Sequence, residues 1–458
     1  MTIATALDTL SPLLGDRLSR SKSDLMAHGQ SESYFPPMPP DAVAWPETVE
    51  EVSALARICS EHGCPIVPWG AGTSLEGHAL APQGGLCVDF ARMNRLLEVH
   101  PEDMDAVAQP GLTREDLNRD LRATGLFFPV DPGANATLGG MAATRASGTT
   151  TVYHGTMAEN VLGLQVVLAD GRVIRTGTRA RKSASGYDLT RLFIGSEGTL
   201  GLITELTLRL HGRPEAVSAA VCVFGAIPDA VECVIATIQS GIEVARIEFV
   251  DAATAAAVNA YSSGSFPEKP HLLVEFHGSE QGVSEQAQRF GDLAREMGGE
   301  GFRWSSQAEE RSALWEMRHK AYWAVLASRK GARAVVTDLC VPISRLAEAV
   351  EETRADIDAS PITGPIFGHT GDGNFHAILL IRDGVPEELE AAKAVSHRMV
   401  ERALRMGGTV TGEHGVGMGK LDYMSAEHGD AWALMGDIKR VFDPTGILNP
   451  GKLIPPAG

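Results

Sequence analysis

Residues 132–143 read PGANATLGGMAA, and this stretch decides how the first half of the chain is interpreted. It continues through Ala146-Ser147-Gly148 to His154-Gly155 with few bulky side chains, so it can contribute little to a hydrophobic core. Small residues instead let the backbone approach a ligand closely, and the backbone N–H groups can then bind phosphates or ring carbonyls. We therefore expect this stretch to lie against a large planar ligand.

Two other glycine-rich segments support this interpretation. Residues 70–77 read GAGTSLEG, and residues 193–204 read FIGSEGTLGLIT. The first segment is not a dinucleotide-binding fingerprint, because its third glycine stands at position 77 and a strand over 86–90 follows where the fingerprint would continue as a helix. By itself it could equally be a tight surface loop. Together, the three segments indicate one extended cofactor that bridges two subdomains.

The pattern of apolar residues predicts mixed helices and strands around these segments. A helix over 48–62 leads into a strand over 65–68, as in an α/β or α+β domain. Residues 161–168 and 173–174 are predicted to pair as a hairpin with a type I′ turn at Asp170-Gly171, and an alternating strand runs up to Leu210.

Near the C-terminus, residues 367–376 read FGHTGDGNFH and residues 411–415 read TGEHG. The turn residues 371–374 could fold the chain back so that both histidines of the first segment point into one pocket. His369, His376 and Glu413 would then form a metal-ligand set that leaves positions open for substrate, and His414 would be left as a base. The alternative is that these are ordinary polar loop residues.

The second half of the chain is predicted to be α+β. Strands are expected over 217–224, 242–250 and 272–277, and helices over 228–239, 251–261 and 283–297. In the strand over 272–277, Glu275 and His277 share one face, either as polar residues on an open sheet face or beside the metal. In the helix over 314–322, Arg318 and Tyr322 share a face, and Arg318 could present its guanidinium to a substrate carboxylate.

Composition limits the classes of function. The chain has 458 residues, of which 44% are hydrophobic and 21% charged, and its net charge is -18. This charge argues against nucleic-acid binding, and the six scattered cysteines argue against an iron–sulfur cluster, a zinc ribbon or a disulfide framework. No apolar run is long enough for a membrane span, and residues 1–34 lack the apolar core of a signal peptide. We expect a cytoplasmic protein, with peripheral attachment at the inner membrane face left open.

The length suits several domains. The expected divisions are an N-terminal lead over 1–40, a cofactor-binding domain over 41–214, a substrate and metal-binding domain over 215–440 and a C-terminal segment over 441–458 that returns to the cofactor domain. Homodimerisation is left open.

These motifs, together with residues 130–133, 194–199 and 442–452, resemble a known family. The first half resembles the FAD-binding domain of the vanillyl-alcohol oxidase type, and the second resembles the FAD-linked oxidase C-terminal domain. Within this family the chain is most similar to D-2-hydroxyacid dehydrogenases of the D-lactate dehydrogenase (cytochrome) type. The resemblance implies an α+β fold, with a two-subdomain FAD-binding domain and an α+β substrate (cap) domain built on an antiparallel sheet.

The resemblance also implies the roles of particular residues. His369, His376 and Glu413 match ligands of one divalent metal, Zn or Mn, and His414 matches the catalytic base. Arg318, Tyr322 and Asn374 match positions that contact the substrate. The positions that match FAD-binding residues are Pro68, Gly70, Ala71, Gly72, Thr73, Ser74, Gly77, Pro132, Gly133, Thr137, Gly139, Gly140, Ala143, Ser147, Gly148, Glu197, Gly198, Ile203 and Asn449.

The implied reaction is oxidation of a D-2-hydroxy acid to a 2-oxo acid, with the hydroxyl proton taken by His414 and hydride passed to flavin N5. Related 2-hydroxyglutarate enzymes carry a lysine just before the position of Asp338-Leu339, where this chain has residues 335–337 (VVT), so a monocarboxylate such as D-lactate is favoured. D-2-hydroxyglutarate or glycolate dehydrogenase is the alternative within the family, and a metallohydrolase is the alternative from another class.

The electron acceptor is expected to be an external partner. The chain has neither a cysteine cluster for an iron–sulfur relay nor a loop for NAD. Reduced flavin would therefore pass its electrons to a cytochrome, an electron-transfer flavoprotein or a quinone.

Overall fold

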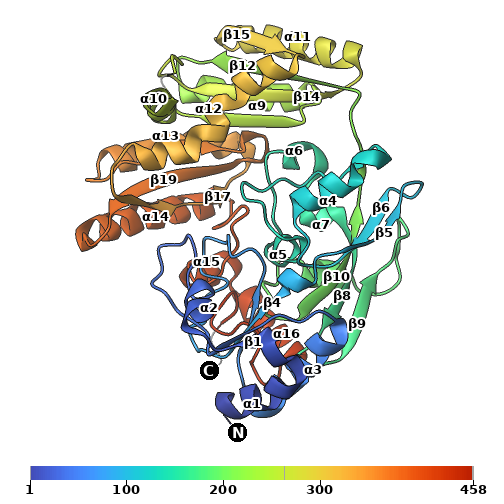
Figure 1. Cartoon of the computed structure of the whole chain (residues 1–458). Coiled ribbons are helices and arrows are strands. Elements are labelled where there is room, and N and C mark those ends of the chain that lie inside the picture. The colour runs from blue at the N-terminus through green and yellow to red at the C-terminus, as the bar shows by residue number, and fades with distance from the viewer. Residues whose placement is uncertain (1, 263, 456–458) are drawn as a thin grey trace. The chain divides into compact units, whose positions relative to one another are not determined.

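The computed structural model describes residues 2–262 and 264–455, and the chain forms two compact units (Figure 1). Unit 1 contains the chain up to Gly148, Gly155–Arg213 and the segment from Glu413 onward; unit 2 contains Thr149–His154 and Pro214–Gly412. The division at Arg213–Pro214 lies one residue from the expected one. The division expected at 440 lies at Gly412–Glu413 instead, because helical periodicity after residue 420 does not reveal which core those helices join.

Unit 1 has two subdomains, each with its own sheet and core. The first sheet has the order β1 (Leu18–Ser19), β2 (Ala42–Ala44), β4 (Leu86–Asp89), β3 (Ile66–Trp69), with β2, β4 and β3 parallel. The second is antiparallel, in the order β5 (Leu96–His100), β6 (Asp105–Ala108), β10 (Leu202–Arg209), β8 (Val161–Val167), β9 (Val173–Gly177). Two further short strands, β7 (Leu126–Phe127) and β11 (His211–Gly212), pair with each other.

The helices of this unit are α1 (Ile3–Leu14), α2 (Lys22–Ala27), α3 (Val49–His62), α4 (Arg114–Asp120), α5 (Leu138–Thr144), α7 (Met157–Asn160), α8 (Leu189–Phe193), α15 (Leu421–His428) and α16 (Asp430–Phe442).

The first residues of the chain are not a separate lead. Helix α1 buries Ala6, Leu7, Leu10 and Leu14 in the same core as α3, β2, β3 and β4. Four apolar residues at helical spacing form a stripe that must be covered, and the first subdomain supplies the cover. The segment expected to be separate over 1–40 is therefore part of unit 1.

The predicted hairpin forms, but its turn differs from the predicted type. Strands β8 and β9 pair up to Val167 and Val173, and Leu168 N donates to Arg172 O at 2.9 Å. Three residues therefore form the connection, and only Gly171, at φ 84°, has a left-handed backbone. A type I′ turn needs two such residues in succession, so Asp170-Gly171 is not one.

Unit 2 is built on one antiparallel sheet of eight strands, as the fold class predicted. Its order is β15 (Glu300–Ser305), β12 (Ala216–Val223), β14 (His271–Gly278), β13 (Arg246–Val250), β18 (Ile366–Gly368), β19 (Asn374–Arg382), β16 (Ala332–Val336), and β17 (Leu339–Cys340) also pairs with β19. Its helices are α6 (Thr151–His154), α9 (Ile227–Gln239), α10 (Ala252–Ser262), α11 (Glu280–Glu296), α12 (Ala308–Ala327), α13 (Leu346–Asp358) and α14 (Pro386–Arg405).

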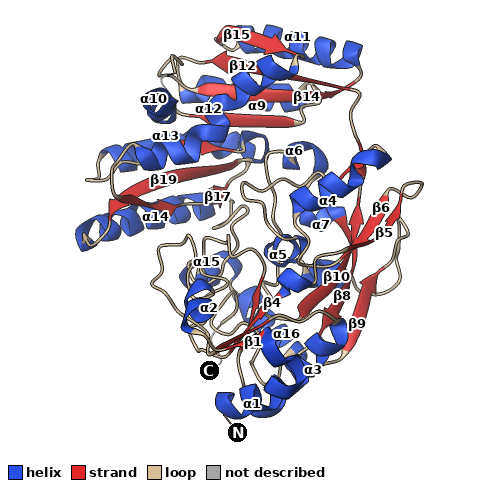
Figure 2. Ribbon diagram, viewed as in Figure 1, coloured by secondary structure: helices blue, strands red, loops and turns tan. Residues whose placement is uncertain are grey.

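Helices cover both faces of this sheet (Figure 2). Successive residues of a strand point to opposite faces. On β14, Leu273 joins the core under α10 and α12, and Phe276 packs against Phe290 of α11 on the other face. The side chains between β13 and α12 therefore lie inside unit 2, and the polar ones among them need partners there.

In the described part of the chain, no helix has the length and apolar character needed to cross a membrane.

Candidate active site

The three glycine-rich segments come together around α5 in unit 1. A Cβ atom on Gly70 would lie 2.3 Å from Thr137 Oγ1, the N-cap of α5, so only glycine fits there. At the other end of the helix, Gly195 N donates to Ala142 O at 2.9 Å and Glu197 N donates to Ala143 O at 2.8 Å. Residues 70–75 remain partly exposed beside this junction. The result is a cradle of loop backbone that suits an elongated ligand with a phosphate group.

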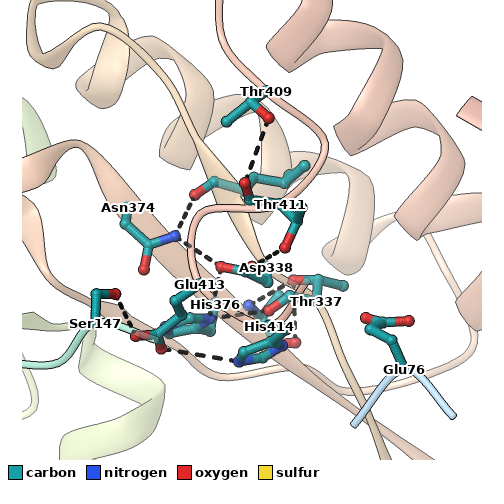
Figure 3. A network of polar contacts seen from close by, with 12 residues as sticks. Glu76, Ser147, Thr337, Asp338, Asn374, His376, Thr409, Thr411, Glu413 and His414 are labelled. Atoms are coloured by element: carbon teal, nitrogen blue, oxygen red, sulfur yellow. Dashed lines mark hydrogen bonds and ion pairs between the residues drawn. The ribbon is translucent and has the colours of Figure 1, made fainter. Parts of the chain in front are cut away.

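Several of the predicted cofactor-binding residues use their side chains within the protein. Ile203 is buried in the core of the second subdomain, and Ser147 Oγ donates to Glu413 Oε2 at 3.0 Å (Figure 3). Asn449 Oδ1 accepts from Lys452 Nζ at 2.6 Å, and Asn449 Nδ2 donates to the carbonyl oxygens of Glu197 and His78. The Asn449 amide is thus held by partners within the protein.

The two predicted metal-binding histidines of unit 2 lie side by side. His369 follows β18, and His376 lies on β19 opposite Phe367 of β18. The turn between the strands contains a 3₁₀ turn, Thr370–Asp372, and Gly373 at φ 77°, which confirms the predicted reversal of the chain. The ring centroids are 5.6 Å apart, and each ring offers a nitrogen within 4.8 Å of one on the other.

Neighbouring groups set the tautomer of each histidine. His376 Nδ1 lies 3.0 Å from Thr337 O, and His369 Nδ1 lies 2.6 Å from Glu248 Oε1. A carbonyl oxygen or a carboxylate can only accept, so Nδ1 carries a proton in both rings, and in a neutral ring the lone pair is then on Nε2. Histidines that hold a metal through one nitrogen commonly donate the other N–H in this way. The pair therefore fits a divalent metal.

Glu248, on β13, was not among the predicted site residues. It is completely buried, and its other oxygen, Oε2, accepts from Arg318 Nε at 2.7 Å. Burial opposes the charged carboxylate, but His369 and Arg318 outweigh that effect and hold the pKa of Glu248 below its usual value. The sequence did offer one sign of its role: Glu248 is an acidic residue in an otherwise apolar part of the strand predicted over 242–250.

The pair considered in its place, Glu275 and His277, lies on the neighbouring strand β14. These two side chains are 2.8 Å apart, and Glu275 Oε1 also lies 3.5 Å from Arg246 Nη1.

Arg318 and Asn374, which are predicted to contact the substrate, are both held in defined orientations by neighbouring side chains. The guanidinium of Arg318 lies over the Phe367 ring at 4.9 Å and is held by Glu248 through Nε, so its two terminal nitrogens are oriented without being used by that contact. Tyr322, one helical turn later, packs against the core under α12. Arg318 thus lies beside His369, whereas Tyr322 contributes mainly to packing.

Asn374 has a fixed amide orientation. Its Nδ2 donates to Asp338 Oδ1 at 2.7 Å and to Leu339 O at 2.8 Å, while Asp338 Oδ2 accepts from Thr411 Oγ1 at 2.6 Å (Figure 3). Asn374 Oδ1 is buried and has no protein donor among the described residues. A buried amide oxygen of this kind needs a donor from a ligand or a water molecule.

The segment that carries Glu413 and His414 follows directly. A Cβ atom on Gly412 would lie 2.1 Å from Asn374 Nδ2, so the backbone passes against Asn374 at the last residue of unit 2. Glu413 is the next residue, and its Oε1 lies 3.8 Å from His414 Nε2.

A glycine-lined cradle in one unit and an oriented histidine pair with an arginine in the other define a flavin-type oxidoreductase. The chain belongs to the FAD-linked oxidase family. Residues 40–177 match the FAD binding domain, and residues 213–453 match the C-terminal domain of FAD linked oxidases. The match to the FAD binding domain identifies FAD as the cofactor of this protein.

Curated relatives extend over most of the chain. A probable mitochondrial D-lactate dehydrogenase from Danio rerio is 48% identical, with 93% of this chain and 87% of the relative covered. A mitochondrial D-lactate dehydrogenase (cytochrome) from Arabidopsis thaliana is 45% identical, with 98% and 80% covered. A glycolate oxidase subunit from Bacillus subtilis is 36% identical, with 90% and 89% covered. Among solved structures, 4-ethylphenol oxidase from Gulosibacter chungangensis has a TM-score of 0.79 at 19% identity, with 99% and 97% covered, which shows a shared fold.

These relatives correct the expected location. The Danio rerio and Arabidopsis thaliana proteins are named as mitochondrial, so the cytoplasmic expectation is wrong. Buried thiols without disulfides indicate only a reducing compartment, and they do not distinguish one reducing compartment from another.

Proposed function

We propose that the protein is an FAD- and metal-dependent dehydrogenase of D-2-hydroxy acids, with D-lactate as the first candidate substrate. The observation that carries the proposal is the His369–His376 pair, with both Nδ1 atoms bonded to acceptors and Arg318 held alongside by Glu248. The names of the D-lactate dehydrogenase relatives support the choice of substrate.

The metal ligands in this proposal are His369, His376 and Glu413. In support, Gly412 lies against Asn374 of β19, the strand that also carries His376, and Glu413 is the next residue in the chain. Two imidazoles and one carboxylate leave coordination positions for substrate and suit Zn or Mn. A bound divalent cation would supply Lewis acidity at the substrate hydroxyl and carboxylate.

The protein's own groups orient the substrate and move the proton. The terminal nitrogens of Arg318 bind the substrate carboxylate, and Asn374 Oδ1 accepts a hydrogen bond from the substrate or from a bound water. A ring nitrogen of His414 takes the hydroxyl proton as the Cα hydrogen leaves with its electron pair. Bound FAD supplies the acceptor for that hydride.

Two observations bear on the alternatives. The glycolate oxidase relative keeps glycolate as the second candidate substrate. Residues 335–337 contain no cation, and the Thr337 hydroxyl is already bonded to the Ala377 backbone, which disfavours a second substrate carboxylate there. A metallohydrolase is no longer supported, because it would have no use for the FAD binding domain.

The test is anaerobic reduction of the purified protein. D-lactate should bleach the flavin band near ~450 nm and yield pyruvate, whereas L-lactate and D-2-hydroxyglutarate should act much more slowly. Prior chelation should stop bleaching, and added Zn or Mn should restore it. A flavin that stays oxidised with both D-lactate and glycolate would refute the proposal.

A further inference from the structure

We propose that the Glu197 side chain is a positioning residue for the loop that carries His414, an inference that rests on the role of His414 in the proposed function. Glu197 Oε1 accepts from Val416 N at 2.7 Å, and Glu197 Oε2 accepts from Gly417 N at 2.9 Å. The carboxylate is buried, with 4% of the residue exposed. Both oxygens therefore bind the backbone two and three residues beyond His414.

The main chain of Glu197 is held in place from both sides. Its N–H donates to Ala143 O at 2.8 Å, and its carbonyl oxygen accepts from Asn449 Nδ2 at 2.7 Å. Lys452 Nζ in turn donates to Asn449 Oδ1 at 2.6 Å. Glu197 has φ 54°, a left-handed conformation that non-glycine residues seldom adopt. Residues held in such sparsely populated backbone conformations cluster at functional sites, and here the conformation directs the carboxylate at the loop.

The loop is shaped to accept this carboxylate. Gly415 has φ 82°, and a Cβ atom there would lie 2.8 Å from Glu197 Oε1 and 2.8 Å from His78 Nε2. Met418, the residue after Gly417, donates its N–H to Glu76 O at 2.8 Å. Three successive backbone N–H groups, from 416 to 418, are thus bound to the glycine-rich segments of unit 1.

In this arrangement the short segment around Glu197 contributes to two parts of the protein. The backbone around Glu197 packs on α5 and helps to form the FAD cradle, while its side chain holds the loop after His414. Charge-assisted hydrogen bonds to a buried carboxylate are stronger than neutral ones. Placement of the base is thereby tied to the same segment that places the flavin.

The variant Glu197→Gln tests the inference, because it keeps the size of the side chain but replaces one acceptor oxygen with a donor. Hydrogen exchange of peptides covering 413–420 should become about 10-fold faster or more, with FAD content retained. With D-lactate, kcat should fall about 10–100-fold while KM stays within about twofold, since a small misplacement of a reacting group costs up to about 10²-fold. The surface variant Glu61→Gln, which removes the same charge from the exposed pair with Arg57, should change neither quantity.

Gly415→Ala provides a second, independent variant, since its methyl group would displace the Glu197 carboxylate and should produce the same pair of effects. Unchanged exchange in both variants would overturn the inference, whether or not the wild-type protein oxidises D-lactate. Faster exchange with a wild-type kcat would overturn it as well. If no D-2-hydroxy acid reduces the wild-type flavin, the proposed function fails, and the exchange measurement still tests the hydrogen bonds.

Discussion

Glu248 shows how much of the candidate site depends on one side chain. It orients His369, holds Arg318 and keeps its negative charge although it is completely buried. We expect Glu248→Gln to lower metal affinity about 10–100-fold, the usual cost of losing a partner of a metal-binding histidine. Elemental analysis after dialysis against graded metal concentrations would measure the effect.

The matched control is Glu316→Gln on α12, which removes an exposed carboxylate paired with Lys320. Equal metal content in wild type and Glu248→Gln would show that Glu248 does not support the ligands.

His414 is the proposed base, and its removal should separate proton transfer from binding. We expect His414→Ala to retain FAD and metal but to reduce flavin about 10²–10⁴-fold more slowly, the range for loss of a general base. Stopped-flow measurement of flavin reduction against pH checks this. Wild-type-like rates at neutral pH would remove His414 from the mechanism.

Lys452 should make the stability of unit 1 depend on pH. Its side chain is fully buried, and burial lowers its pKa from 10.5 to about 7, against opposing effects of Glu197 and Cys87. Between these two values the unfolded state binds more protons than the folded state, so the free energy of unfolding should rise with pH. Below pH ~7 both states are protonated, and the contribution no longer changes.

Lys452→Met, which keeps most of the volume, isolates this effect. Denaturant unfolding followed by flavin release should show the wild type gaining stability relative to the variant from pH 7 to pH 10. A constant difference across that range would mean that Lys452 keeps an ordinary pKa.

At the scale of elements, α1 is expected to stabilise unit 1 as part of its core. Leu10 and Leu13 both belong to α1: Leu10 is buried in the core of the first subdomain, whereas Leu13 is 40% exposed. Leu10→Ala should lower the free energy of unfolding by about 2–5 kcal/mol, the usual cost of a large-to-small change in a core. Leu13→Ala should cost much less. Equal effects in a denaturant titration would indicate that α1 is only loosely attached.

At the scale of the whole molecule, the net charge of -18 bears on the electron acceptor. The sequence predicts an external electron acceptor, and the Arabidopsis thaliana relative is named as a D-lactate dehydrogenase (cytochrome). A basic cytochrome would be attracted by the acidic protein, so its reduction rate should fall as ionic strength rises from about 0.01 to 0.3 M, because salt screens the attraction. Reduction of an uncharged dye should hardly change.

Steady-state D-lactate oxidation with each acceptor supplied alone checks this prediction. NAD and NADP should not support turnover, and oxygen should be a slow acceptor. Turnover that requires NAD, or that is equally fast with oxygen alone, would contradict the dehydrogenase assignment.

Local patterns in the sequence were enough to predict much of this protein. Helix α3 covers Val49–His62, close to the predicted 48–62, with Thr48 as its N-cap and Gly63 as its C-cap, because capping and apolar periodicity act over a few residues. The turn between His369 and His376 was predictable for the same reason, since glycine and asparagine chemistry selects a chain reversal locally. The glycine-rich segments likewise identified backbone that must lie close to a ligand.

Only the tertiary structure decided which distant groups meet. Glu248 reaches His369 across 121 positions of sequence, and Glu197 reaches Val416 across 219. The sequence around a glutamate is similar whether its carboxylate faces solvent or a buried partner. The periodicity of apolar residues therefore cannot show which distant group a glutamate will contact. The membership of residues 413–440 in unit 1 was hidden for a related reason. An amphipathic helix shows in its sequence that it has a face to bury, but the packing of the whole chain determines which core covers that face.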